Sequence, residues 1–337
     1  MVMVVDVPGM VRLLKGHGVE RFLAELTDYI SADFARWPSF EKSPRAASHS
    51  KVGVIELMPT SDGELYGFKY VNGHPINTRS GKLTVTAFGV LADVATGYPL
   101  FVCEMTLLTA LRTAATSALA ARHVARPDST VMALIGTGAQ AEFQALAFKA
   151  VNGVKRIRYY DIDAGAMAKF ARNLAGSGLV LEAAGSAAEA AEGADIITTA
   201  TAAKTRIELV TEAMVRPGMH LNAIGGDCPG KTEVAAGVLD HARIFVEYTP
   251  QTLIEGEIQA RPGTADGVTE LWEVIAGLKP GRQSATEITL FDSVGFAIED
   301  FAALRYVHDL AAGRGGAAEL ALVPTVSDPK DLYGLLV

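Results

Sequence analysis

Residues 136–141 read GTGAQA and match G-x-G-x-x-G/A, the spacing of a loop that binds the phosphates of a dinucleotide. They follow an expected strand and open an expected helix. Gly136 would allow the tight turn, and Gly138 would let the backbone approach a pyrophosphate. The N-terminus of the helix would supply free N–H groups and a partial positive charge. The alternative is a structural glycine turn without a ligand.

An acidic residue stands where such a loop needs one. Asp161 lies 23 residues past Gly138 (161 − 138), at the end of the next expected strand. A carboxylate there accepts hydrogen bonds from the ribose hydroxyls of adenosine and repels a 2′-phosphate. Residues 161–165 contain no Arg or Lys, so the sequence favours NAD over NADP. The alternative is a solvent-facing aspartate.

Residues 222–233, NAIGGDCPGKTE, place an acid in a fixed turn after another expected strand. In open α/β sheets the ligand crevice lies outside the carboxyl ends of the strands. Asp227 is therefore expected where a general acid or base reaches the nicotinamide end of the cofactor. An N-cap or Asx-turn aspartate is the alternative that spacing alone leaves open.

Two cations stand in apolar surroundings. Lys69 lies inside an expected strand and Arg112 inside a long expected helix. Burying a lone cation is costly, so each implies a carboxylate partner or an anionic ligand. Arg45 precedes the same expected sheet, and Glu56 shares a strand face with valines. The alternatives are salt bridges within the protein, snorkelling to the surface and, for Glu56, a solvated edge position.

The elements that must position these side chains fall into two groups. Residues 10–37 have helical spacing, four segments between 52 and 105 alternate with period two between turn signals, and residues 105–125 form a long helix. This first group predicts an antiparallel sheet with helices. We expect residues 1–128 to form one domain, completed by a returning tail at 295–337 that begins with a helix.

After Pro127, strands that read as apolar runs alternate with helices. This alternation predicts a doubly wound parallel sheet with helices on both faces, so residues 129–294 are expected to form a Rossmann-type domain. The expected strands are 130–136, 156–161, 180–185, 195–201, 219–225, 242–248 and 287–295. The fold class is thus α/β, with an additional α+β domain whose sheet is mainly antiparallel.

Composition excludes several classes of protein. A hydrophobic fraction of 49% excludes intrinsic disorder, and a net charge of −8 without a basic run argues against a nucleic-acid partner. No apolar stretch is long enough to span a membrane, and no secretory signal is apparent. The two cysteines, Cys103 and Cys228, are far apart, which suits a reducing compartment and a cytoplasmic protein. The seven histidines lack metal-ligand spacing, so no metal site is expected.

Five segments carry a resemblance to a known family. GGDCPGKTE (225–233) is highly specific, and residues 55–75, 136–148, 245–259 and 291–301 are similar too. On these segments the chain resembles the ornithine cyclodeaminase/mu-crystallin family over nearly its whole length. The CPGKTE form together with Asp161 fits the NAD-dependent cyclodeaminase branch better than the ketimine reductase or alanine dehydrogenase branches.

The resemblance implies a homodimer in which each subunit has a Rossmann NAD domain and a substrate domain. The sheets of the two substrate domains would join in a closed, barrel-like interface. It also implies an ammonia-lyase reaction that converts L-ornithine to L-proline and ammonia. A hydride would pass from Cα to bound NAD+, the distal amine would close the ring with loss of ammonia, and the hydride would return to the same carbon.

The resemblance also assigns roles to single residues. Asp227 would be the general acid/base, and Glu56 would meet the distal ammonium of ornithine. The other substrate-binding residues would be Arg45, Lys69, Arg112 and Val294. The expected cofactor contacts are Thr84, Arg112, Gly136, Gly138, Ala139, Gln140, Asp161, Thr201, Asn222, Gly225, Lys231 and Ser293. Alternatively, Thr84 and Ser293 are ordinary strand hydroxyls, and Lys231 is a counter-charge for Glu233.

Other functions stay open at this point. The same superfamily contains NAD(P)-dependent imine reductases and amino-acid dehydrogenases, and related cyclodeaminases accept arginine or lysine. A crystallin-like binding protein without activity is a third possibility. The intact set of Arg45, Lys69, Arg112 and Asp227 argues against that last function.

Overall fold

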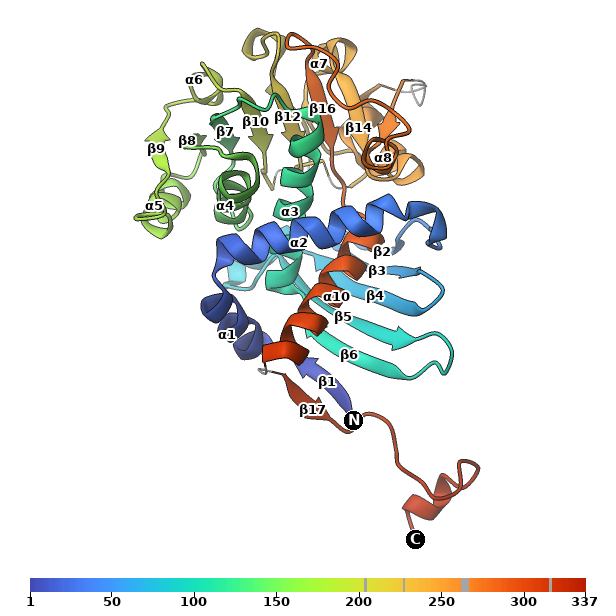
Figure 1. Ribbon diagram of the computed structural model, residues 1–337. Coiled ribbons are helices and arrows are strands. Elements are labelled where there is room, and N and C mark those ends of the chain that lie inside the picture. Colours follow the sequence, from blue (N-terminus) through green and yellow to red (C-terminus); the bar gives the residue numbers. More distant parts are fainter. Residues whose placement is uncertain (203–204, 227, 262–266, 315–316) are drawn as a thin grey trace.

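The computed structural model describes residues 1–202, 205–226, 228–261, 267–314 and 317–337. Two sheets organise the chain and lie in separate halves of the molecule (Figure 1). One is seven-stranded in the order β17-β1-β6-β5-β4-β3-β2, and the other is eight-stranded in the order β15-β14-β16-β12-β10-β7-β8-β9. The long helix α3 (Thr106–Val124) runs between the halves.

The seven-stranded sheet is mainly antiparallel, as predicted, with one parallel pair between β1 and β6. Its strands are β1 (Val2–Val5), β2 (Ala46–His49), β3 (Val54–Ser61), β4 (Leu65–Gly73), β5 (Val85–Asp93), β6 (Pro99–Glu104) and β17 (Ala318–Leu320). The pairing of β17 with β1 brings the end of the chain back to its beginning. The strands β1, β2 and β17 were not expected from the sequence.

One face of this sheet is covered by α10 (Ala297–Arg314), which lies across β3, β4 and β5 (Figure 1). Two glycines allow the close approach. A Cβ at Gly67 would lie 2.9 Å from the Phe301 ring, and one at Gly89 would lie 3.0 Å from Leu304. The helices α1 (Val7–His17) and α2 (Val19–Ala35) complete the layer, separated at Gly18, whose φ is +87°.

Every neighbouring pair in the eight-stranded sheet is parallel, which confirms the predicted doubly wound arrangement. Its strands are β7 (Val131–Ile135), β8 (Arg156–Tyr160), β9 (Val180–Ala183), β10 (Ile196–Thr199), β12 (His220–Ala223), β14 (Arg243–Val246), β15 (Thr269–Glu270) and β16 (Thr289–Asp292). The chain runs outward from β7 in both directions, so the strand order reverses between β7 and β10. A ligand crevice is expected at such a point.

In the part of this half that the structure describes, six α-helices accompany the parallel strands. They are α4 (Ala141–Asn152), α5 (Ala164–Asn173), α6 (Ala187–Ala191), α7 (Ala236–His241), α8 (Thr249–Glu255) and α9 (Leu271–Ile275). The central strands β10, β12 and β16 are buried along their whole length, which explains their unbroken apolar runs. A short parallel pair, β11 (Arg206–Val210) with β13 (Thr232–Val234), was not expected. Among the described residues, no helix combines the length and apolar character of a bilayer span.

Candidate active site

The loop after β7 has the geometry of a phosphate-binding loop. Gly136 has a φ of +100°, and a Cβ there would lie 2.6 Å from the carbonyl oxygen of Ala200, so only glycine fits. Gly138 is exposed, and a Cβ there would meet nothing within 4 Å. The helix α4 begins after Gln140, which makes no side-chain capping bond. The first N–H groups of α4 therefore suit the pyrophosphate of a dinucleotide.

Asp161 follows β8 directly and lies at the rim of this loop. Its Oδ2 accepts hydrogen bonds from the Thr137 backbone N (2.6 Å) and Oγ1 (3.1 Å), and its Oδ1 accepts one from Asp163 N (2.9 Å). A carboxylate has about four acceptor positions, so it retains capacity for ribose hydroxyls. The site therefore fits the adenosine end of NAD.

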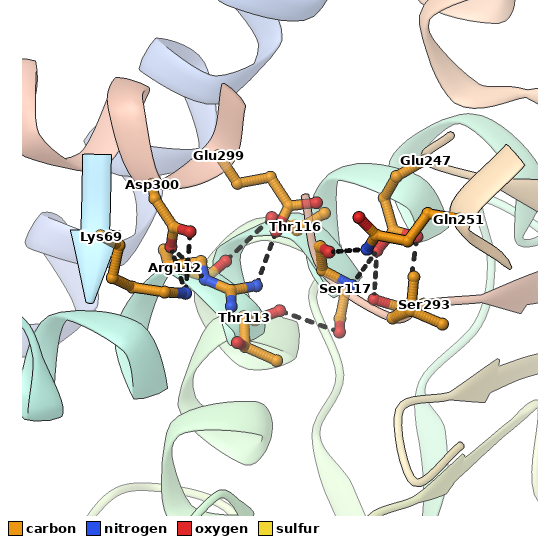
Figure 2. Close-up of polar contacts among 12 residues, drawn as sticks. Lys69, Arg112, Thr113, Thr116, Ser117, Glu247, Gln251, Ser293, Glu299 and Asp300 are labelled. Atoms are coloured by element: carbon orange, nitrogen blue, oxygen red, sulfur yellow. Dashed lines mark hydrogen bonds and ion pairs between the residues drawn. The ribbon is translucent and has the colours of Figure 1, made fainter. Parts of the chain in front are cut away.

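Lys69 and Arg112 are both buried and share one carboxylate, that of Asp300 (Figure 2). Lys69 Nζ lies 2.8 Å from Asp300, and Arg112 Nε lies 2.9 Å from it. Arg112 Nη1 also donates to Glu299 at 2.7 Å. The sequence predicted that both cations need partners, and the partners in this state are two acids in the first turn of α10.

Charge is unbalanced around this pair of cations. Three buried carboxylates, those of Glu247, Glu299 and Asp300, act on Lys69 and Arg112. Burial raises the pKa of Glu299 to about 8, against the opposing effect of Arg112 and with the support of the Glu247 charge. Burial and the neighbouring Arg112 lower the pKa of Lys69 to about 8. One surplus carboxylate is thus most stable when it holds a proton near neutral pH.

Arg45 reaches the same region from the segment before β2. Its Nη2 donates to the carbonyl oxygens of Val294 (2.7 Å) and Gly295 (2.8 Å), and its Nη1 donates to Glu56 (3.2 Å). Its Nε lies 3.2 Å from Glu255. Glu56 is only 8% exposed, so the alternative of a solvated edge position is wrong.

The loop after β16 joins these groups. Glu247 accepts hydrogen bonds from Ser293 Oγ (2.5 Å), Val294 N (3.2 Å) and Gly295 N (3.2 Å), which fixes the path of the loop (Figure 2). Gly295 has a φ of +77°, and a Cβ there would lie 2.7 Å from Arg112 Nη1. The structure thereby places Ser293 and Val294 in the same loop as the contacts to Arg45 and Arg112.

The segment after β12 contacts Thr201, which follows β10 and lies beside Gly136 of the phosphate loop. Lys231 Nζ donates to the Thr201 carbonyl oxygen at 3.0 Å, and Thr201 Oγ1 donates to Glu233. A Cβ at Gly225 would overlap the Glu233 carboxylate, so glycine is required for packing. Asp227, the expected general acid/base, lies outside the described residues.

Two predicted cofactor residues have other partners. Asn222 is fully buried in β12 and donates to Gln144 Oε1 and Thr198 Oγ1, both at 3.3 Å, so it links the sheet to α4. Thr84 precedes β5, and its carbonyl oxygen accepts from His74 N at 2.8 Å. None of the hydrogen bonds found for the described part of the chain connects Thr84 with the cations.

Sequence reasoning missed the acids and the amide that surround the cations: Glu247, Gln251, Glu299 and Asp300. Gln251 donates to the Gly295 carbonyl oxygen at 2.8 Å and so supports the loop after β16. The sequence does mark these acids, since Glu299 and Asp300 interrupt an apolar helix and Glu247 ends the apolar run of a strand. A buried acid needs a partner for the same reason as a buried cation.

Residues 8–315 match the model of the ornithine cyclodeaminase/mu-crystallin family. The chain belongs to this family. An ornithine cyclodeaminase of Agrobacterium fabrum is 60% identical over 99% of this chain and 94% of the relative. A lysine cyclodeaminase, solved to explain its recognition of L-lysine, L-ornithine and L-2,4-diaminobutyric acid, has a TM-score of 0.90 at 31% identity and covers 99% of both chains. An archaeal alanine dehydrogenase dimer with bound NAD has a TM-score of 0.86 at 32% identity, covering 96% of this chain and 99% of that one.

Proposed function

We propose that the protein is an NAD-dependent ornithine cyclodeaminase, an ammonia-lyase that converts L-ornithine to L-proline and ammonia. One observation carries the proposal. The buried cations Lys69 and Arg112, the partly buried Arg45 and the buried acid Glu56 gather around Asp300 and the loop after β16, in a chain 60% identical to proteins named ornithine cyclodeaminase. A diamino acid presents one carboxylate and one distal ammonium, and this set of charges complements both.

The cofactor site uses the loop at 136–141. The open backbone at Gly138 and the free N–H groups of α4 hold the pyrophosphate, and Asp161 accepts from the ribose. Ala139, Gln140, Thr201, Lys231 and Ser293 lie on or beside the strand ends that border the crevice, and Thr84 and Asn222 stay proposed contacts. Held by these residues, NAD+ would supply a hydride acceptor for Cα of the substrate and, once reduced, a hydride donor.

The substrate site lies at the cation cluster. Arg45, Lys69 and Arg112 hold the α-carboxylate, Val294 forms a wall, and Glu56 pairs with the distal ammonium. The acids around Lys69 and Arg112 fix the positions of these cations while the site is free of substrate. Asp227 takes protons from the reacting amines and stabilises positive charge at the reacting carbon–nitrogen bond.

We also propose that two copies of the chain assemble through the outer face of the seven-stranded sheet. The face opposite α10 exposes apolar side chains from four adjacent strands: Ile55, Leu57, Tyr66, Phe88 and Leu100. Such a face in water favours association. The proposed domains are 1–128 with 295–337 for substrate and dimerisation, and 129–294 for NAD. Within the described residues, Cys103 and Cys228 form no disulfide, in keeping with the proposed cytoplasmic location.

The proposal is tested by incubating the protein and a catalytic amount of NAD+ with L-ornithine. We expect proline and ammonia in equal amounts, with no accumulation of NADH at 340 nm. NADH formed in step with product would assign a dehydrogenase instead, and faster turnover of L-lysine or L-arginine would correct the substrate. Absence of turnover in a folded, NAD-binding protein would contradict an enzymatic function.

A further inference from the structure

We propose that Glu257 is a positioning residue of this site, which holds the segment around Gly226 in place through its carboxylate. The inference rests on the proposed function, because it assigns the segment a role in turnover. Glu257 lies at the start of the 3-10 turn Glu257–Ala260 and is completely buried, far along the chain from the segment that it contacts.

The first step is the contact with the far end of the segment. Glu257 Oε2 accepts hydrogen bonds from Glu233 N and Val234 N, both at 2.9 Å, and its Oε1 lies 3.0 Å from Glu233 N. Both carboxylate oxygens are therefore used to fix the backbone where β13 begins.

The second step is the contact with the near end. A Cβ at Gly226 would lie 2.8 Å from Glu257 Oε1, so this carboxylate rests against Gly226. Gly225 packs against the Glu233 carboxylate in the same way. Two acids thus occupy the space that side chains at 225 and 226 would fill. Gly226 directly precedes Asp227 in the sequence, so the backbone that leads to the proposed acid/base is held by Glu257.

The third step shows what holds Glu257 itself. Asp292, at the end of β16, accepts hydrogen bonds from Glu257 N and Ile258 N at 2.9 Å each. Ser293, which binds Glu247 beside the cation cluster, is the next residue along the chain. One strand end therefore positions both the cations that hold substrate and the segment that carries Asp227.

The charges around Glu257 make this hold sensitive to pH. Burial raises the pKa of Glu257 to about 7, the neighbouring Glu233 adds to the rise, and Lys231 opposes it. Asp292, packed against the same turn, has a pKa raised well above its ordinary value by burial and by the Glu257 charge. A protonated Glu257 has one oxygen that accepts poorly, so the segment is held less firmly as the pH falls below 7.

The experiment compares Glu257→Gln with the wild type. Glutamine keeps the shape but presents an NH2 group to a backbone donor, as the protonated acid presents an OH. We expect kcat for proline formation to fall about 10- to 100-fold, the cost of a misplaced reacting group, while KM for ornithine changes less than about twofold. The decline of wild-type kcat below pH 7 should be absent in the variant.

Asp195→Asn is the matched control. Asp195 Oδ2 also accepts two backbone N–H bonds, from Thr130 (2.8 Å) and Val131 (3.0 Å), but it lies before β10, at the amino ends of the parallel strands. This variant should lower thermal stability and leave kcat and its pH profile unchanged. Gly226→Ala serves as a second variant, because its new Cβ displaces the Glu257 carboxylate and should reproduce the loss of kcat.

The outcomes separate this inference from the proposed function. A wild type without ornithine turnover contradicts the proposed function. The positioning role alone is contradicted if the wild type converts ornithine but a folded Glu257→Gln protein has the same kcat and the same decline of kcat below pH 7. The same loss of kcat in Asp195→Asn as in Glu257→Gln would also overturn it, since any lost carboxylate–backbone contact would then suffice.

Discussion

We propose that the Asp161 carboxylate selects between the two nicotinamide dinucleotides. We expect Asp161→Ser to weaken NAD+ binding by about 10- to 100-fold, the effect of losing one or two charge-assisted hydrogen bonds, and to improve NADP+ binding because repulsion of the 2′-phosphate is removed. Calorimetric titration of both cofactors measures the change. An unaltered preference for NAD+ would show that Asp161 serves only its bonds to Thr137 and Asp163.

Glu299 makes stability depend on pH. Its folded pKa of about 8 lies above the ordinary value, so its contribution to stability is complete below about pH 4.5 and is lost as the pH rises through 8. The free energy of unfolding of the substrate-free wild type should therefore fall between pH 5 and 8.5 more steeply than that of Glu299→Gln. The difference in slope is at most about 1.4 kcal/mol per pH unit, the value for one proton.

Urea unfolding at several pH values measures both slopes. Glutamine at 299 is neutral throughout, so only the pH dependence is compared and not the absolute stability. Parallel curves for the two proteins would contradict the surplus carboxylate in the cation cluster.

The sequence indicated that Lys69 and Arg112 need partners, but it did not identify them. The Lys69–Asp300 pair joins residues 231 positions apart, and Arg112 meets Glu299 across 187. Such contacts arise only when α10 folds back onto β4 and α3. The spacing within one segment carries no information on them, whereas the phosphate loop was predictable because its function depends on six consecutive residues.

The turn between β7 and α4 depends on a single backbone conformation. Gly136→Ala would force a side chain into a φ of +100° and against the Ala200 carbonyl oxygen. We expect a loss of about 1–3 kcal/mol in unfolding free energy and a weaker NAD+ affinity. Gly153→Ala, at the αL end of α4 with no contact within 4 Å, is the control that should lower stability and leave NAD+ binding unchanged. Equal losses of NAD+ affinity in both variants would contradict the assignment.

The helices and strands that could be predicted are those whose hydrophobic pattern is contained within their own segment of the sequence. The parallel strands β7, β10 and β12 read as apolar runs because both faces are buried. In contrast, β2 and β17 are exposed along their whole length, and β1 is fully buried only at its first and last residues. These short strands exist because a neighbour offers hydrogen bonds, and that neighbour is distant in the sequence.

The outer face of the seven-stranded sheet predicts how the chain assembles. Phe88 is 45% exposed and stacks on Tyr70 at 5.2 Å in the middle of this face. We expect Phe88→Asp to convert a dimer into a monomer, because a carboxylate would be buried without a partner. Light scattering after size-exclusion chromatography measures the mass. Leu278→Asp, at a position 67% exposed after α9, should leave the mass unchanged. An unchanged mass for Phe88→Asp would place the interface elsewhere.

In the proposed reaction, a hydride leaves Cα of ornithine and returns to the same carbon within one closed site. Mass spectrometry of proline formed from α-deuterated L-ornithine, in the presence of excess unlabelled NADH, tests this claim most directly. We predict that the deuterium is retained at C2 of proline in every turnover. Proline that has lost its deuterium to the NADH pool would contradict the claim and would indicate a reductase or dehydrogenase that exchanges its cofactor.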